Sequence, residues 1–193
     1  MPNCYQCNDS DRKISKKEFN KTELGLPKDA FVFACFNANN KITSVEFDIW
    51  MNLLKRVKNS FLWLYKSNDY SVINLKKESE KRGVASSRII FADRVPNQDH
   101  LARIKCADLF LDTFNCNAHT TASDALWAGL PVVTKLGNSF VSRVGGSLLN
   151  AIGLPELVTD NKKDYETLIL QQKQKQKNKQ TYKHTNTYND NYT

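Results

Sequence analysis

Short apolar runs of strand length alternate with helical patterns five or six times along the chain, and no hairpin signal separates one run from the next. The expected strands are 30–36, 60–65, 88–92, 108–112 and 131–134, with a short edge element at 154–158. The first run is apolar at nearly every position, which is typical of a strand covered on both faces. This alternation predicts an α/β fold, a Rossmann-like parallel sheet with helices on both faces.

Helical periodicity fills the intervals between these strands. Thr43 and Glu46 have the spacing of a capping box, and a helix is expected from there to about residue 58. A charged helix over 70–82 is predicted to stop at Gly83, because glycine readily adopts the left-handed conformation that ends helices. Further helices are expected after Pro96, over 121–129, over 140–152 with Gly145 and Gly146 as a weak point, and over 165–170.

Composition divides the 193 residues into three parts. Residues 1–28 are polar and predict an N-terminal arm or the remnant of an inter-lobe segment, and residues 29–170 hold the strands and helices. Residues 171–193 carry five lysines and one aspartate, a net charge of +4 out of +8 for the whole chain. Because this Lys/Gln/Asn-rich tail offers no apolar face, we expect it to be disordered, with weak binding to polyanions as the functional alternative.

Cysteine usage and hydropathy predict the cellular compartment of the protein. The sequence has no apolar run long enough to span a membrane and no signal-peptide layout at its start. Five cysteines, an odd number, are typical of a reducing compartment. Cys4 and Cys7 form a CxxC without a second pair, so a zinc site there is improbable. The expectation is a soluble, cytoplasmic protein without a membrane partner.

Three loops at the predicted carboxyl ends of the strands carry polar residues: 37–42, 94–103 and 114–124. Ligands of such sheets bind at that edge. His119, Thr120 and Thr121 lie at a helix start, where backbone N–H groups without intrahelical partners can bind a phosphate. Lys41 and Arg103 add two cations, so together these residues predict a diphosphate site.

Two further side chains extend this site to a nucleotide. His100 could lie against a planar base, and Asp124 could accept hydrogen bonds from sugar hydroxyls. Taken singly, each has a structural alternative: a surface histidine, and an acid favoured by the helix dipole. The chain has no Walker loop, GxGxxG, Ser-His-Asp set or metal cluster. Any catalysis would therefore act by stabilising a departing diphosphate.

These residues lie in blocks that resemble the C-terminal catalytic half of the O-linked N-acetylglucosamine transferases, glycosyltransferase family 41. The similarity is to the bacterial branch that is attached to tetratricopeptide repeats, and it extends from about residue 5 to residue 170. The blocks that carry it are 36–37, 41–42, 50, 54–57, 60–64, 88–91, 100–103, 107–113 and 117–131.

The resemblance implies a role for each candidate residue. Lys41 would hold the donor diphosphate and aid its departure, and Asn37 would belong to the same donor site. His100 would stack on the uracil, and Arg103 would support the nucleotide site. The remaining donor-binding residues would be His119, Thr120 and Thr121 at the diphosphate and Asp124 at the ribose.

The resemblance also implies an architecture and a reaction. Members have two GT-B lobes, invert the anomeric centre without a metal, and modify Ser or Thr hydroxyls of cytoplasmic or nuclear proteins. This chain would be the C-terminal, donor-binding lobe of a transferase that uses UDP-N-acetylglucosamine, without the N-terminal lobe and the repeats. Ala38 and Asn97 stand where animal members have glutamine and lysine.

Two alternatives stay open at this point. The SPINDLY-type branch resembles the same family but uses GDP-fucose. A non-catalytic nucleotide-binding or interaction module would keep the fold without transfer activity, and a nucleic-acid partner is not favoured. Because the resemblance assigns part of the active site to the N-terminal lobe, the isolated C-terminal lobe is expected to be inactive alone.

Overall fold

The computed structural model describes residues 4–9 and 11–189, with side chains described as far as Gln176. Its centre is one six-stranded sheet in the order β3-β2-β1-β4-β5-β6, in which every neighbouring pair is parallel. The strands are β1 (Phe31–Cys35), β2 (Ser60–Tyr65), β3 (Ile89–Ala92), β4 (Leu109–Leu111), β5 (Val132–Lys135) and β6 (Val158–Thr159). The predicted Rossmann-like sheet is confirmed.

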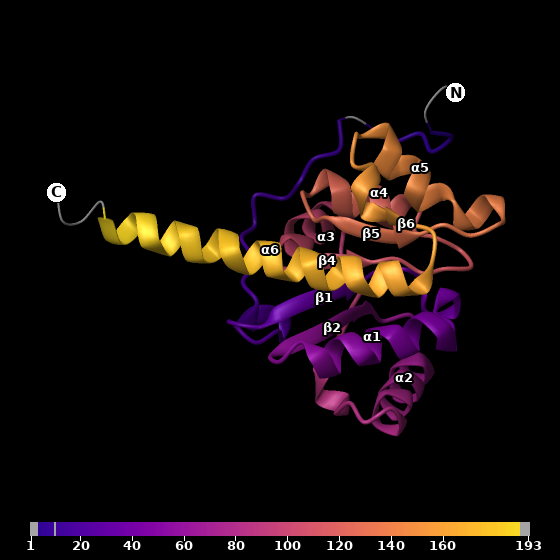
Figure 1. Cartoon of the computed structure of the whole chain (residues 1–193), viewed down its shortest axis with the longest axis horizontal. Coiled ribbons are helices and arrows are strands. Elements are labelled where there is room, and N and C mark those ends of the chain that lie inside the picture. Colours follow the sequence, from indigo (N-terminus) through magenta and orange to yellow (C-terminus); the bar gives the residue numbers. More distant parts are fainter. Residues whose placement is uncertain (1–3, 10, 190–193) are drawn as a thin grey trace.

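Helices connect the strands and cover the sheet (Figure 1). They are α1 (Ser44–Arg56), α2 (Asp69–Lys81), α3 (Asn97–Arg103), α4 (Thr120–Trp127), α5 (Val144–Ala151) and α6 (Lys162–Asn189). Short 3-10 turns lie at Thr22–Leu24, Asn39–Lys41, Ser86–Arg88, Ile104–Cys106, Phe140–Ser142 and Pro155–Leu157. The chain winds outward from β1 to β3 and returns to place β4 beside β1. That reversal opens a crevice between the β1 and β4 loops, where ligands of such sheets bind.

The core lies between the sheet and its helices. The largest fully buried side chains include Trp50, Trp63 and Tyr165, from α1, β2 and α6. The Tyr165 hydroxyl donates to the carbonyl of Asp112 (3.1 Å) and accepts from the Trp50 indole (3.4 Å), so α6 is fixed against α1 and the end of β4. Cys35 is fully buried in this core, and burial raises the pKa of its thiol.

Local signals in the sequence set several helix ends. Thr43 and Glu46 form the predicted capping box at the start of α1. Gly83 adopts the left-handed conformation (φ 73°) just after α2, as predicted. The expected edge element at 154–158 instead begins as the 3-10 turn Pro155–Leu157 and pairs with β5 only at Val158 and Thr159. Proline lacks the N–H that a paired strand donates, which explains the delayed pairing.

The N-terminal and C-terminal segments pack differently against the body of the lobe. Residues 11–28 run along the body and contact α3 through Ser15 and α4 through Arg12. The expected disordered tail is different: α6 continues through residues 171–189, and the Gln176 amide donates to the Asp108 carbonyl (2.7 Å). Glutamine and lysine are good helix formers, and extending an existing helix has no nucleation cost. Residues 190–193 lie outside the described residues.

Within the described residues, no helix is both long and apolar enough to cross a membrane.

Candidate functional site

Asn37, just after β1, joins the loop of the first strand to the start of α4. Its amide nitrogen donates to the Thr113 hydroxyl (2.7 Å) and to the Asp112 carboxylate (3.3 Å), both at the end of β4. Its amide oxygen accepts from the Thr121 hydroxyl in the first turn of α4 (2.5 Å). The first and third predicted loops therefore meet at the switch between β1 and β4.

Asp112 organises the loop that follows β4, and sequence reasoning did not identify it as part of the site. Its Oδ1 accepts from the backbone N–H groups of Thr113 (2.8 Å) and Ala118 (2.6 Å), and its Oδ2 accepts from the Thr134 hydroxyl of β5 (2.6 Å). Burial raises the pKa of the Asp112 carboxyl to about 7, although these hydrogen bonds oppose the shift. The only sequence signal was an acid directly after an apolar strand.

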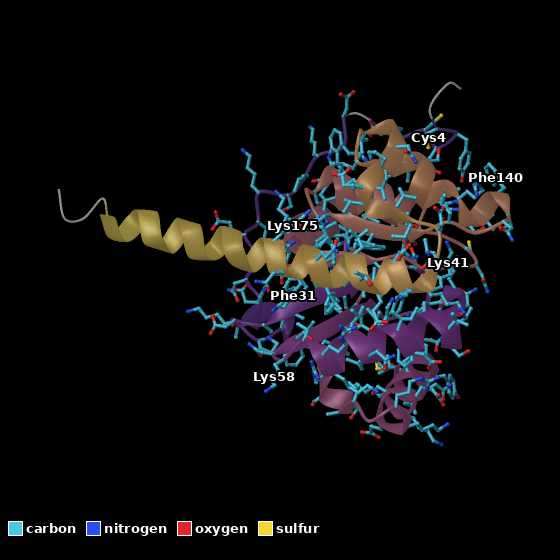
Figure 2. The ribbon with its side chains drawn as sticks, viewed as in Figure 1. Cys4, Phe31, Lys41, Lys58, Phe140 and Lys175 are labelled. Atoms are coloured by element: carbon cyan, nitrogen blue, oxygen red, sulfur yellow. The ribbon has the colours of Figure 1, made fainter. Side chains whose placement is uncertain are left out.

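The start of α4 offers hydrogen-bond donors beside a lysine. His119 is the N-cap residue, and its side chain makes no capping bond. The first N–H groups of the helix therefore have no intrahelical acceptor, and the His119 side chain does not cap them. The Lys41 ammonium donates to the Asn117 carbonyl in the same loop (3.2 Å). Figure 2 shows Lys41 at the opposite end of the sheet from Phe31 and Lys58.

A hollow of about 460 Å³ lies beside this helix start. Its lining residues are Phe36, Ala38, Tyr65, Arg94, Val95, Asn97, His100, Arg103, Thr121 and Asp124. Four predicted site residues, from two of the predicted loops, thus share one cavity. Outside this lining are Asn37, Lys41, His119 and Thr120. They form a second group, in which Lys41, from the 3-10 turn after β1, donates to Asn117 just before the start of α4. The bond between Asn37 and Thr121 links the two groups.

His100 and Arg103 give the hollow a neutral ring beside a buried cation. The His100 ring packs edge-on against Phe36, with 4.9 Å between the ring centres. Burial, and then the nearby Arg103 charge, lowers the pKa of His100 to about 4, so the ring is neutral at pH 7. The Arg103 Nε donates to the His100 Nδ1 (3.4 Å).

Arg103 is only 5% exposed, and among the described residues no carboxylate pairs with it at ion-pair distance. A buried cation without an ionic partner is energetically costly in the empty protein. Because Arg103 lines the hollow, an anionic ligand there would supply the missing partner.

The N-terminal arm contacts three of the predicted site residues, and sequence reasoning gave it no role in the site. The Tyr5 hydroxyl lies 2.7 Å from the His119 Nδ1. The Gln6 amide donates to the Thr120 hydroxyl (3.5 Å), and Arg12 forms an ion pair with Asp124. Figure 2 shows Cys4, near the start of the arm, on the same side of the molecule as Phe140. Arginines are common on surfaces, so nothing in the sequence distinguished Arg12 from its neighbours.

Metal ligation has no candidate cluster in the part of the chain that the structure describes, where no three His, Cys, Asp or Glu side chains are grouped. The expectation that the site works without a metal stays a prediction.

The chain is similar to a known protein family and to several of its members. The profile of glycosyl transferase family 41 matches residues 11–188. The chain is 37% identical over 172 residues to a probable UDP-N-acetylglucosamine–peptide N-acetylglucosaminyltransferase, SEC, of Arabidopsis thaliana, covering 86% of this chain and 18% of the relative. It is 38% identical over 150 residues to the UDP-N-acetylglucosamine–peptide N-acetylglucosaminyltransferase of Caenorhabditis elegans, covering 78% and 13%. Plant relatives named SPINDLY are also similar.

A solved structure is similar as well. A lysine-to-methionine mutant of the Thermobaculum terrenum O-GlcNAc transferase superposes with a TM-score of 0.71 at 33% identity, over 74% of this chain and 28% of that chain. The chain spans less than a fifth of the length of the Arabidopsis thaliana and Caenorhabditis elegans relatives.

Proposed function

Because this chain belongs to glycosyl transferase family 41, we propose that it is the donor-binding lobe of a protein O-GlcNAc transferase that uses UDP-N-acetylglucosamine. The observation that carries the proposal is the meeting of the β1 and β4 loops, through Asn37 and Thr121, beside a hollow lined by His100, Arg103 and Asp124. This places helix-end donors, cations, a neutral ring and a carboxylate at one edge of the sheet.

The uracil, the ribose and the diphosphate of a UDP-sugar each have a matching group at this edge. The neutral His100 ring suits a stacked uracil, and Asp124 suits the ribose hydroxyls. The N–H groups at the start of α4 and the Lys41 ammonium suit the diphosphate. Arg103 is a buried cation that an anionic ligand would balance.

In the proposed reaction an acceptor hydroxyl of Ser or Thr attacks the anomeric carbon of the sugar. The new C–O bond forms as the bond to the diphosphate breaks, and UDP leaves with the bonding electron pair. The hydroxyl proton passes to a base that we do not assign to this lobe. Lys41 and the α4 N–H groups would stabilise the charge that develops on the leaving diphosphate. The proposal includes no metal, so a chelator should leave UDP affinity unchanged.

In this proposal the complete enzyme also contains a companion N-terminal lobe and tetratricopeptide repeats. It acts on an acceptor protein in the cytoplasm. Coverage of 18% and 13% of two curated relatives is consistent with a larger enzyme. The proposal for the present chain is therefore donor binding.

Calorimetric titration with UDP and GDP tests the proposal directly. UDP should bind more tightly than GDP, and His100→Ala should weaken UDP binding about 2- to 10-fold, the range expected for one stacking contact. Preference for GDP would instead favour a GDP-fucose donor. This second candidate is supported by the similarity to the SPINDLY relatives. Failure of the wild-type chain to bind either nucleotide would overturn both.

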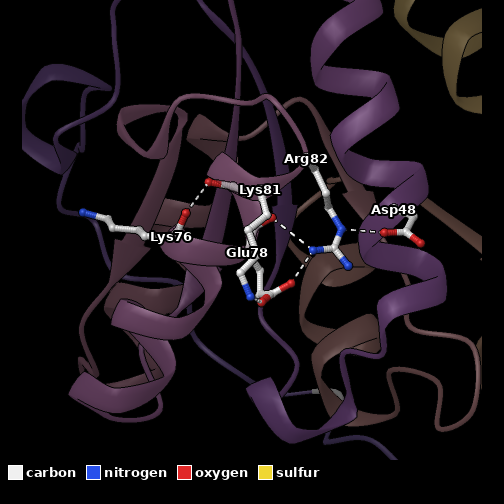
Figure 3. A network of polar contacts seen from close by, with 6 residues as sticks. Asp48, Lys76, Glu78, Lys81 and Arg82 are labelled. Atoms are coloured by element: carbon white, nitrogen blue, oxygen red, sulfur yellow. Dashed lines mark hydrogen bonds and ion pairs between the residues drawn. The ribbon is translucent and has the colours of Figure 1, made fainter.

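Arg82→Ala is a matched control for this titration. Arg82 follows α2 and pairs with Asp48 of α1 and Glu78 of α2 in the network shown in Figure 3. Arg82 is half-buried and its carboxylate partners are exposed, so these pairs contribute little to stability, and none of these residues lines the hollow. The control should therefore bind UDP like the wild type.

A further inference from the structure

The arm residue Arg12 is held firmly against α4. Its guanidinium pairs with the Asp124 carboxylate, and only 14% of the Arg12 side chain and 7% of the Asp124 side chain are exposed. The guanidinium also lies 5.4 Å from the centre of the Trp127 ring, and the Trp127 indole donates to the Arg12 carbonyl (3.3 Å). These three contacts fix the arm beside the hollow, although Arg12 itself is not among the lining residues.

Asp124 depends on its neighbours to remain ionised. Burial raises the pKa of its carboxyl, and the charge and hydrogen bond of Arg12, with a smaller contribution from Asn97, oppose that shift. A protonated Asp124 would lose acceptor capacity, whereas an ionised carboxylate can accept several hydrogen bonds at once. Arg12 engages Oδ1, which leaves lone pairs of the carboxylate for other donors.

We propose that Arg12 is a positioning residue that sets the preference of this site for ribose hydroxyls. It acts through Asp124, which it keeps ionised and oriented while Asp124 lines the hollow. The inference rests on the proposed function, since it takes the ligand to be a nucleoside diphosphate. It assigns the arm a part in donor recognition that the strands and helices of the lobe do not supply.

The test compares UDP with 2′,3′-dideoxyuridine diphosphate, which lacks both hydroxyls, by calorimetry between pH 5.5 and 8.5. Wild type should prefer UDP at least about tenfold, because hydrogen bonds to a charged acceptor are the strong ones. Arg12→Ala should reduce this preference, with the greatest loss at low pH and recovery as the pH rises. The sign follows from removing a cation, which raises the pKa of Asp124 further. Arg12→Lys should retain part of the preference.

Two further variants separate this role from a structural one. In an Asp124→Asn background, Arg12→Ala should change the hydroxyl preference no further, because the carboxylate through which Arg12 acts is absent. Arg56→Ala removes an ion pair with Glu166 between α1 and α6 and should leave the preference unchanged. Circular dichroism melts identify variants that do not fold, and the Asp124→Asn single variant then carries the test through the same hydroxyl comparison.

The outcomes distinguish the inference from the proposed function. A wild-type chain that does not bind UDP contradicts the proposed function. A wild type that prefers UDP, with an Arg12→Ala variant that keeps the same ratio and pH profile, overturns the inference alone. Tighter UDP binding by Arg12→Ala would also overturn it, because the arm would then be a competitor of the ligand. If Arg12→Ala does not fold, an Asp124→Asn variant that keeps the wild-type preference overturns it.

Discussion

At the scale of single residues, the buried carboxylate of Asp112 is the centre of the site's framework. It accepts hydrogen bonds from two backbone N–H groups of its own loop, from the Thr134 hydroxyl and from the Asn37 side-chain amide. With a pKa of about 7, Asp112 lies between its charged and neutral forms at physiological pH. The same group thus shapes the loop before α4 and makes the stability of the fold depend on pH.

Asp112→Asn should remove this pH dependence. The folded pKa lies above the unfolded value of about 3.8, so the contribution of Asp112 to stability is full below pH 4 and is lost as the pH rises through 7. His100, with its lowered pKa, contributes the opposite slope between about pH 4 and 6.5. Urea unfolding at pH 5, 6, 7 and 8 should show the variant gaining on the wild type, by up to about 1.4 kcal/mol per pH unit below pH 7.

Asp160→Asn, at an exposed acid, serves as the control and should follow the wild type across this range. Parallel curves for Asp112→Asn and the wild type would mean that the Asp112 carboxyl has the same pKa in both folded and unfolded chains.

Single-residue signals in the sequence predicted some residues of the candidate site and missed others for a physical reason. Lys41, His100 and Asp124 follow strand ends or lie near helix starts, and local pattern is enough to place them at the carboxyl edge. The partners Arg12 and Asp112 act through contacts with residues far along the chain, such as Asp124 and Thr134. Only the folded chain brings these pairs together, so neither could be predicted from its neighbours.

At the scale of elements, α5 approaches the sheet where two glycines allow it. A Cβ added to Gly145 would lie 2.5 Å from the Asp112 Oδ2 and 2.8 Å from the Thr134 Oγ1, two atoms fixed by their mutual hydrogen bond. A Cβ added to Gly146 would meet the tip of the Leu136 side chain, at 2.4 Å. The sequence marked this pair as a weak point of the helix, but close packing gives Gly145 a specific reason to be glycine.

Gly145→Ala should therefore destabilise the fold by about 1–3 kcal/mol, even though alanine favours helices by about 1 kcal/mol. Gly146→Ala is the matched control in the same helix, because the flexible Leu136 tip can move aside, and its cost should be smaller. Chemical denaturation of both variants gives the comparison. Equal stabilities would show that α5 can shift away from Asp112 without cost.

At the scale of the whole molecule, the two edges of the sheet differ in their chemistry. The proposed donor site occupies the carboxyl edge, and a second hollow of about 490 Å³ lies at the other edge, near the start of β1. Lys21, Lys28, Lys58 and Lys173 line this second hollow. Figure 1 shows α6 crossing the body and extending past it at that end. Any polyanion attracted by these lysines and by α6 would therefore contact a region separate from the donor site.

Removing residues 177–193 tests what the projecting part of α6 contributes. Gln176 is the last residue with a described side-chain contact to the body, and the sequence beyond it has no apolar face to bury. The deletion should leave the melting temperature and UDP affinity unchanged. Deleting 171–193 instead also removes the Gln176 contact and should lower the melting temperature slightly.

The same deletions decide whether α6 recruits a polyanion. Residues 177–193 hold three lysines and one aspartate, a net charge of +2, so their loss should reduce retention on a heparin column and flatten its salt dependence. If retention is unchanged, the charge beyond residue 176 has no part in binding, and the lysines around the second hollow become the relevant group. If UDP affinity falls with the deletion, the two edges of the sheet are coupled, which the separation of donor site and lysine cluster does not predict.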